Sequence, residues 1–186
     1  MIHEVVVTTV NEHGAVHIAP MGIWTEDGFT VIAPFKPSQT LTNVELTGVA
    51  VVNVTDDVRL FAGCVTGRSD WPVYPATMVN GNVLDASISH NELRVVKKAD
   101  DELRPRIYMI EVHNAVTRAF RGFNRAQAAI IEASVLVSRL DMLPAEKIDA
   151  EMEYLSIAVE KTSGAKEKEA WQWLVEAIEN FRQESD

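Results

Sequence analysis

The chain of 186 residues contains little cysteine, few aromatic residues and few positive charges. Its single cysteine, Cys64, excludes an internal disulfide and predicts a reducing compartment. Acidic residues outnumber basic ones 27 to 17, and the net charge of -10 disfavours nucleic-acid and anionic membrane partners. No apolar run approaches the roughly 20 residues that cross a bilayer, and the N-terminus does not resemble a signal peptide. We therefore expect a cytoplasmic protein with neither nucleic acid nor membrane as a partner.

Several motifs of catalytic and nucleotide-binding proteins are also missing. No P-loop is present, and no GxGxxG follows a predicted strand, which argues against a Walker ATPase and a Rossmann protein. Cys64 lies in an apolar stretch and is expected to be a buried small residue, not a nucleophile. The histidines form neither an HExxH motif nor a Cys/His cluster, so the sequence predicts no metal site. The five histidines are His3, His13, His17, His90 and His113.

The first two thirds of the chain are rich in β-branched residues, and the last third has a helical pattern. Strands are predicted where apolar runs are separated by turn residues, and Asn80-Gly81 predicts a tight hairpin turn. After residue 121 three helices are predicted, the first capped by Asn124 and the second beginning at Pro144. The predicted strands span residues 2–10, 15–23, 29–33, 49–55, 76–79, 83–88, 93–98 and 107–116.

A polar loop runs from Ala33 to Asn43, between two apolar strands. Its two prolines keep the first half out of a helix. The segment Thr42-Asn43-Val44-Glu45 fits a capping box and predicts a short helix that begins near Asn43 and ends at Gly48. Lysine, hydroxyl and amide groups then crowd the positive end of this helix, where a phosphate group would be held. The alternative is a polar connection with an ordinary cap.

The second predicted strand contains a proline and a glycine. Alternation places Met21 on one face and Pro20 and Gly22 on the other. Pro20 implies an edge, a bulge or interrupted pairing, and Gly22 permits close approach of another backbone or of a flat ligand. The alternative is a simple bulge or strand end.

Basic and aromatic residues gather at two further places. Arg118, Arg121 and Arg125 surround the start of the helix that Asn124 caps, where they oppose the helix dipole unless an anion is present. This junction is a second candidate anion site, with salt bridges to the acidic surface as the alternative. The loop from residue 67 to 75 includes Arg68 and Trp71 and is typical either of a ligand lid or of a segment folded onto the core.

These features resemble a known family. The order of Glu4–Thr9, Ala19-Pro20-Met21-Gly22, Phe29 to Asn43 and Val49–Val54 resembles the FMN-binding split β-barrel of flavin reductase-like proteins over residues 1–118. The segment Phe123-Asn124-Arg125-Ala126 is similar to a domain-of-unknown-function branch of that superfamily, from archaea and methylotroph-type bacteria. The resemblance implies an α+β fold: a six- to seven-stranded antiparallel split barrel at residues 1–121, then three helices at 122–186, packed on the barrel or on a dimer partner.

The resemblance also implies a cofactor, FMN, and a homodimer with the flavin near the interface. The loop would hold the phosphate, and the second strand would lie along the isoalloxazine ring. The Arg68–Trp71 loop or the Arg121–Arg125 junction is then a candidate contribution of the partner subunit. The implied cofactor-binding residues are Pro20, Met21, Gly22, Ile23, Lys36, Ser38, Gln39, Thr40, Thr42 and Asn43, with Arg68, Trp71, Arg121, Asn124 and Arg125 as the additional group.

Three functions remain open on this basis. The first is an FMN-binding flavoprotein that acts as a flavin-dependent oxidoreductase; no catalytic side chain is implied, because the flavin supplies the redox chemistry. The second is a non-catalytic accessory protein that binds flavin or a pterin-like ring, with a link to tetrahydromethanopterin one-carbon metabolism. The third is a structural dimer with a vestigial site. The helical C-terminal third, absent from typical flavin reductases, leaves the choice between enzyme and binding protein open.

Overall fold

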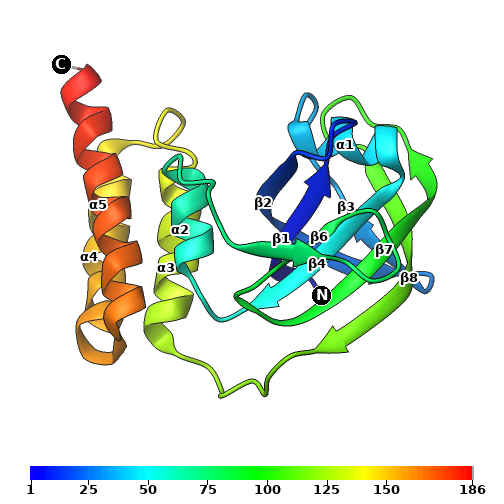
Figure 1. Cartoon of the computed structure of the whole chain (residues 1–186). Helices are drawn as coiled ribbons and strands as arrows, with labels where there is room; N and C mark the ends of the chain where they lie inside the picture. The colour runs from blue at the N-terminus through cyan, green and yellow to red at the C-terminus, as the bar shows by residue number, and fades with distance from the viewer. Residues whose placement is uncertain (186) are drawn as a thin grey trace. The chain divides into compact units, whose positions relative to one another are not determined.

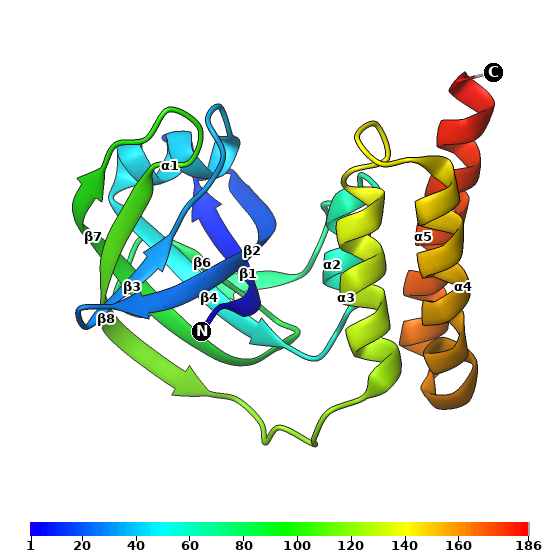
Figure 2. The same cartoon turned by 180° about the vertical axis from the view of Figure 1, so that it is seen from behind.

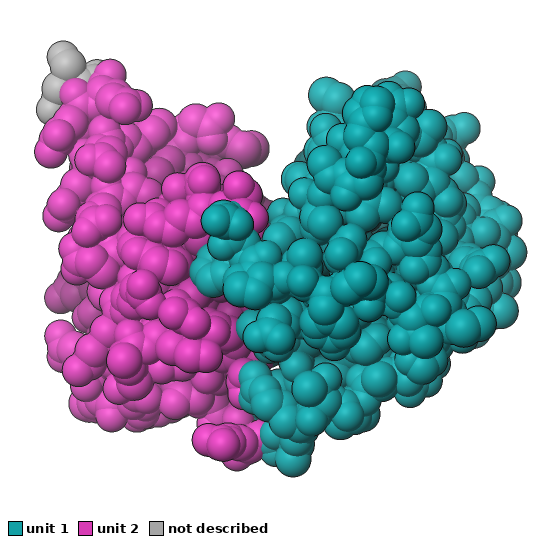
Figure 3. Space-filling view, viewed as in Figure 1, with its two compact units in different colours: residues 1–55, 70–120 teal, residues 56–69, 121–186 magenta. Residues whose placement is uncertain are grey.

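The computed structural model describes residues 1–185, which form two compact units. Unit 1 contains residues 1–55 and 70–120, and unit 2 contains residues 56–69 and those from 121 onward (Figure 3). The chain therefore leaves unit 1 after Thr55, returns at Asp70 and leaves it again after Phe120. The short insertion at 56–69 joins the C-terminal helices in one unit.

Unit 1 is a closed antiparallel barrel with the strand order β1-β2-β3-β8-β7-β4 (Figures 1 and 2). Its interior is filled by aliphatic residues from all the strands and by Leu41 and Val44 of helix α1 (Gln39–Thr47). The predicted α+β fold with a six- to seven-stranded barrel is confirmed. The barrel strands are β1 (His3–Val10), β2 (Val16–Glu26), β3 (Phe29–Ile32), β4 (Val49–Thr55), β7 (Ser87–Ala99) and β8 (Arg106–Val116).

Strand β4 closes the barrel because it pairs with β1 on one side and β7 on the other. Its residues 50–53 are buried, as its nearly all-apolar sequence indicates. Asn53 is fully buried, and its amide nitrogen donates to the carbonyl oxygen of Val6 at 3.1 Å. Its amide oxygen accepts from the N–H of Leu84 at 2.9 Å and the hydroxyl of Ser87 at 3.0 Å. This buried amide therefore has a structural role in the barrel.

The hairpin predicted at Asn80-Gly81 has a different form. Strands β5 (Val73–Pro75) and β6 (Asn82–Leu84) pair with each other, and the connection between them runs from residue 76 to 81. The prediction of a strand at 76–79 is wrong for a physical reason. The carboxylate of Glu92, on β7, accepts the N–H groups of residues 77, 78 and 79, so these donors are not available to a strand partner.

Unit 2 consists of helices α2 (Arg59–Val65), α3 (Arg125–Val137), α4 (Ala145–Thr162) and α5 (Ala165–Ser185), which share one apolar core. The predicted cap at Asn124 is confirmed, because its side chain accepts the N–H of Ala126 at 2.8 Å. Pro144, predicted in the first turn of the second helix, is the residue just before α4. Helix α2 begins at Arg59, after Val58 as the preceding residue. Among residues 1–185, no helix is long and apolar enough to cross a membrane.

Candidate functional site

Helix α1 follows the polar loop at one end of the barrel (Figures 1 and 2). It begins at Gln39, and the Ser38 hydroxyl caps it by accepting the N–H of Leu41 at 3.3 Å. The predicted start near Asn43 with Thr42 as the cap is therefore wrong. A capping-box pattern is local, and here it falls inside a helix that Ser38 has already started. Gly48 ends the helix with a left-handed φ of 69°, as predicted.

The early start of α1 divides the predicted phosphate-binding residues into two sets. Thr40 and Asn43 point into the protein, with exposed fractions of 3% and 1%. The amide nitrogen of Asn43 donates to the Thr9 hydroxyl on β1 at 3.0 Å, and its amide oxygen accepts from the Gln39 side chain at 2.6 Å. Asn43 thus anchors the helix to the barrel. Gln39, Thr42 and Lys36 are exposed, and Ser38 is half-buried beside them.

The first turn of α1 carries free hydrogen-bond donors. The Ser38 carbonyl accepts the N–H of Thr42 at 3.1 Å, and the Ser38 hydroxyl takes the N–H of Leu41. Within the described residues, the N–H groups of Gln39 and Thr40 have no hydrogen-bond partner. These donors lie at the positive end of the helix dipole, and the exposed Lys36 lies in the loop just before the helix. The arrangement is suited to an anion.

The structure adds Arg104 to this loop, a residue that the sequence reasoning missed. The Arg104 guanidinium donates to the carbonyl oxygen of Ala33 at 3.1 Å and lies 4.6 Å from the centre of the Phe35 ring. The Lys36 N–H in turn donates to the carbonyl of Leu103 at 2.8 Å. The connection between β7 and β8 is therefore joined to the polar loop and brings a second cation to it. No local pattern in the sequence signals this tertiary contact.

Asp101 shapes the segment that presents Arg104. Its carboxylate accepts the N–H of Arg104 at 2.7 Å and that of Leu103 at 2.9 Å. These backbone hydrogen bonds hold the pKa of the Asp101 carboxyl below its usual value, with smaller contributions from Arg106 and Lys36. The segment around residues 101–104 is consequently an ordered turn, in which the carboxylate stays ionised at neutral pH.

Strand β2 carries the second set of predicted site residues. It is paired with β1 from Val16 to Ile23, including Pro20 with Val6, and with β3 only from Ile23 to Glu26. Pro20 thus lies on a stretch with one free edge, the first of the options that its presence predicted. Met21 and Ile23 pack against the barrel core, so Pro20 and Gly22 face outward.

Gly22 leaves little space on this outward face. A Cβ atom built there would lie 2.6 Å from the Cγ2 atom of Ile2, whose side chain is 65% exposed. Because that exposed side chain can rotate away, no rigid neighbour inside the described residues fills the position. The outward strip at Pro20 and Gly22 is therefore a narrow backbone surface that a flat group can approach.

The additional predicted residues lie in both units. Trp71 belongs to unit 1, and Arg68, Arg121, Asn124 and Arg125 belong to unit 2. The Arg68 guanidinium donates to the Thr66 hydroxyl at 2.7 Å and lies 4.4 Å from the centre of the Trp173 ring. Asn124 uses its amide to cap α3 and to donate to the carbonyl oxygen of Thr162 at 3.0 Å. Both side chains thus make interactions that hold unit 2 together.

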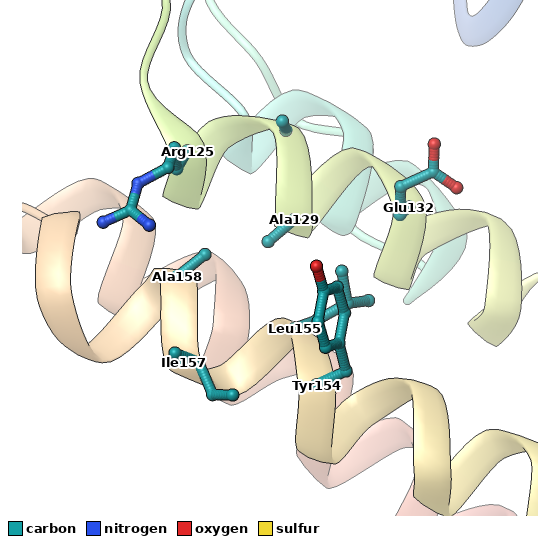
Figure 4. A pocket seen from close by; sticks show the side chains of 8 residues that line it. Arg125, Ala129, Glu132, Tyr154, Leu155, Ile157 and Ala158 are labelled. Atoms are coloured by element: carbon teal, nitrogen blue, oxygen red, sulfur yellow. The ribbon is translucent and has the colours of Figure 1, made fainter.

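Arg125 lines a groove on the surface of unit 2 (Figure 4). The groove has a volume of about 290 Å³ and lies between α3 and α4. Figure 4 shows Arg125 at one end and Glu132 at the other, with the Tyr154 ring opposite α3. Apolar residues form most of the floor, so the groove is not an anion site like that at α1. Its lining residues are Arg125, Ala128, Ala129, Glu132, Tyr154, Leu155, Ile157 and Ala158.

Comparison with solved structures places the fold among flavin-binding proteins. An FMN-bound DUF447 protein from Methanosarcina mazei matches with a TM-score of 0.80 and 22% identity over 95% of this chain and 94% of that one. A 2-nitrobenzoate 2-nitroreductase from Pseudomonas fluorescens matches with a TM-score of 0.52 and 23% identity, over 61% of this chain and 64% of that one. A split-barrel protein from Shewanella frigidimarina matches with a TM-score of 0.55 and 13% identity, over 67% and 74% respectively.

Sequence comparison gives the family directly. No curated protein matches the chain. The N-terminal domain of a protein family of unknown function, DUF447, matches residues 3–118, and the second domain of the same family matches residues 124–176. The two matches cover well over half of the sequence, and they confirm the predicted resemblance to an uncharacterised branch of the split-barrel proteins. The chain belongs to the DUF447 family.

Proposed function

We propose that this protein binds FMN in unit 1, with the phosphate at the first turn of α1 and the ring beside the outward strip of β2. The observation that carries the proposal is the pair of free N–H groups of Gln39 and Thr40 at that turn, preceded by a loop that carries Lys36 and binds Arg104 through the Ala33 carbonyl. It is supported by the fold, because a protein of the same family with this fold over nearly its whole length is FMN-bound.

The donor set fits the charge of the group. A phosphate monoester is close to a dianion at neutral pH, and helix N-termini with adjacent cations bind such groups. Lys36 and Arg104 supply two positive charges on the loop, and the α1 turn carries the hydroxyls of Ser38 and Thr42. Thr40 and Asn43 are buried, so we assign them to the support of α1 and no longer to direct contact with the phosphate.

We further propose that the protein is an oxidoreductase. Bound flavin would supply electron transfer, and the chain would bind and orient it with the backbone of residues 20–23 and the α1 turn. Anaerobic addition of NADH or NADPH to the FMN complex tests this, with bleaching of the flavin absorbance as the expected result. Flavin that stays oxidised with both donors would favour the accessory-protein function.

A homodimer remains our proposal, and sedimentation of the full chain tests it.

The phosphate contacts are tested by a double substitution, Lys36→Ala with Arg104→Ala. A hydrogen bond to a charged group contributes about 1.5–3 kcal/mol, so the affinity for FMN is expected to fall about 10- to 100-fold or more. Riboflavin lacks the phosphate, and its affinity is expected to stay within about 2-fold of that of the unmodified protein. Fluorescence titration with both ligands gives the two dissociation constants.

The matched control is Lys147→Ala, which removes an exposed lysine of unit 2 that pairs with Glu151 at 3.8 Å. It should leave the FMN affinity unchanged. Equal weakening of FMN and riboflavin by the double substitution would place the phosphate elsewhere.

The outward strip of β2 is tested by Gly22→Leu. A leucine there would project from the face on which we place the ring, and the Ile2 side chain can move aside. We expect the affinities for FMN and riboflavin to fall together, about 10-fold or more, while the midpoint of thermal unfolding changes little. Normal binding of both flavins by a folded Gly22→Leu protein would exclude this face. The same titration as above provides the measurement.

A further inference from the structure

Three potential metal ligands lie together on two neighbouring strands of the barrel. His90 and Glu92 are two residues apart on β7, so their side chains share one face. His113 on β8 is the residue paired with Glu92 in the antiparallel ladder. One ligand atom from each of the three side chains lies within 4.8 Å of the other two. None of these three residues belongs to the first turn of α1 or to the outward strip of β2, where we place the flavin.

His90 has an unusual environment. Its side chain is 4% exposed, and neither ring nitrogen has a hydrogen-bond partner among the described residues. Its Nε2 atom lies 3.5 Å from the Oε1 atom of Glu92, which is within ion-pair range but does not meet the geometry of a hydrogen bond. A buried polar group without a partner costs about 1–3 kcal/mol and calls for an explanation. The rings of Tyr74 and His113 contact His90 but provide no acceptor for it.

Glu92 supplies a fixed negative charge at the same place. The backbone N–H groups of residues 77, 78 and 79 donate to the Glu92 carboxylate, and these hydrogen bonds favour its ionised form. The Oε1 atom accepts the Thr77 N–H at 2.7 Å, and the other two bonds go to Oε2. Oε1, the atom near His90, therefore retains a free lone pair.

We propose that His90, Glu92 and His113 bind a divalent transition-metal ion of the zinc class. Two imidazoles and a carboxylate suit zinc, and the ligand atoms of a tetrahedral site lie about 3.3–3.5 Å apart. His90 Nε2 and Glu92 Oε1 already have this separation, at 3.5 Å. The ion would satisfy the unpartnered Nε2 of His90, and half-buried His113, whose ligand atom lies within 4.8 Å of the other two, would complete the set.

Half-buried His113 also provides the route of entry, because it is the most exposed of the three residues. Three protein ligands leave a fourth position of a tetrahedral ion to water or to a small ligand. The strands themselves hold the ligands in place, since His90 and Glu92 are fixed by the β7 backbone and Glu92 is fixed further by the loop at 77–79.

Metal titration of the untagged full-length protein, first stripped with a chelator, tests this site without any dependence on flavin. Zn²⁺ calorimetry is expected to give one equivalent with a dissociation constant of about 1 μM or lower, and Co²⁺ is expected to produce visible absorption bands. His113→Ala and His90→Ala should each weaken Zn²⁺ binding about 100-fold. His113 is half-buried, so His113→Ala remains informative if His90→Ala does not fold.

His13→Ala is the matched control, because His13 lies 3.6 Å from Glu12 in an exposed histidine–carboxylate pair. It should bind Zn²⁺ as tightly as the unmodified protein. The absence of saturable one-to-one binding would overturn the proposal, as would full retention of that binding in folded His113→Ala. Circular dichroism establishes that each variant is folded.

Discussion

Replacement of Asn53 by alanine is expected to lower the free energy of unfolding of unit 1 by about 3–5 kcal/mol. Asn53 is fully buried on β4, and its amide links β4 to β1, β6 and β7. It donates to the Val6 carbonyl of β1 at 3.1 Å and accepts from Leu84 at 2.9 Å and Ser87 at 3.0 Å. Alanine would leave the N–H of Leu84 and the hydroxyl of Ser87 buried without an acceptor.

Urea denaturation measures this effect as a shift of the midpoint at constant slope. The matched control is Asn80→Ala, in the exposed connection between β5 and β6, where a surface substitution changes stability by about 0.5 kcal/mol or less. A loss below about 1 kcal/mol for Asn53→Ala would mean that the barrel does not depend on this amide.

Asp57→Asn is expected to lower the stability of unit 2 by about 2–4 kcal/mol at pH 7. The Asp57 side chain is 3% exposed, and its carboxylate accepts from Arg59 at 2.8 Å and from the ammonium of Lys166 at 2.8 Å. These contacts connect α2 with the start of α5. Asparagine has nearly the same shape as aspartate, but it removes the negative charge that Arg59 and Lys166 share. Because both cations are partly exposed, solvent reduces the free-energy cost of this loss.

The pH dependence gives this prediction a second readout. Burial raises the pKa of the Asp57 carboxyl, but hydrogen bonds from Arg59 and Lys166 outweigh it and lower the pKa overall. A carboxyl with a lowered pKa stabilises the fold above its unfolded pKa, near 3.9, and loses that contribution as the pH falls through its folded pKa. The stability difference between the two proteins should therefore be constant from pH 7 to about 5 and should shrink below about pH 4.

Tryptophan fluorescence follows the unfolding, because Trp171 and Trp173 lie in α5. Asp149→Asn is the control, since Asp149 pairs with Arg182 at 2.6 Å on the surface, where ion pairs contribute about 0–1 kcal/mol. A difference between Asp57→Asn and the unmodified protein that stays the same down to pH 3 would contradict the assignment.

Much of the fold could be predicted from local sequence patterns. The apolar run of β4 indicates a buried central strand, which the structure contains. Asn124 and Gly48 were predicted to mark the start of one helix and the end of another, and both positions are confirmed. The failures lie where a tertiary partner overrides a local pattern. A tight turn was predicted at Asn80-Gly81, but the structure has a longer connection there. The reason is that Glu92, 13 residues from Val79 in the sequence, accepts a hydrogen bond from the Val79 N–H. The grouping of α2 with the C-terminal helices has no local signal either.

The candidate site was predictable only in part, for the same reason. Lys36 and Ser38 could be found because they adjoin a helix start. Arg104 instead reaches the loop through its hydrogen bond to Ala33, which is 71 residues away in the sequence. The cluster of His90, Glu92 and His113 depends on the register of β7 with β8, which includes a shift between Glu92 and Leu93. Sequence spacing between histidines cannot show such a cross-strand arrangement.

The absorption spectrum of the purified protein tests the central claim most directly. We expect flavin bands in the visible region, a released ligand with the mass of FMN and one FMN per chain. A colourless preparation is expected to acquire the same bands when FMN is added and the excess is removed. A protein that is purified without flavin and also fails to bind added FMN would contradict the assignment of the α1 turn as a phosphate site.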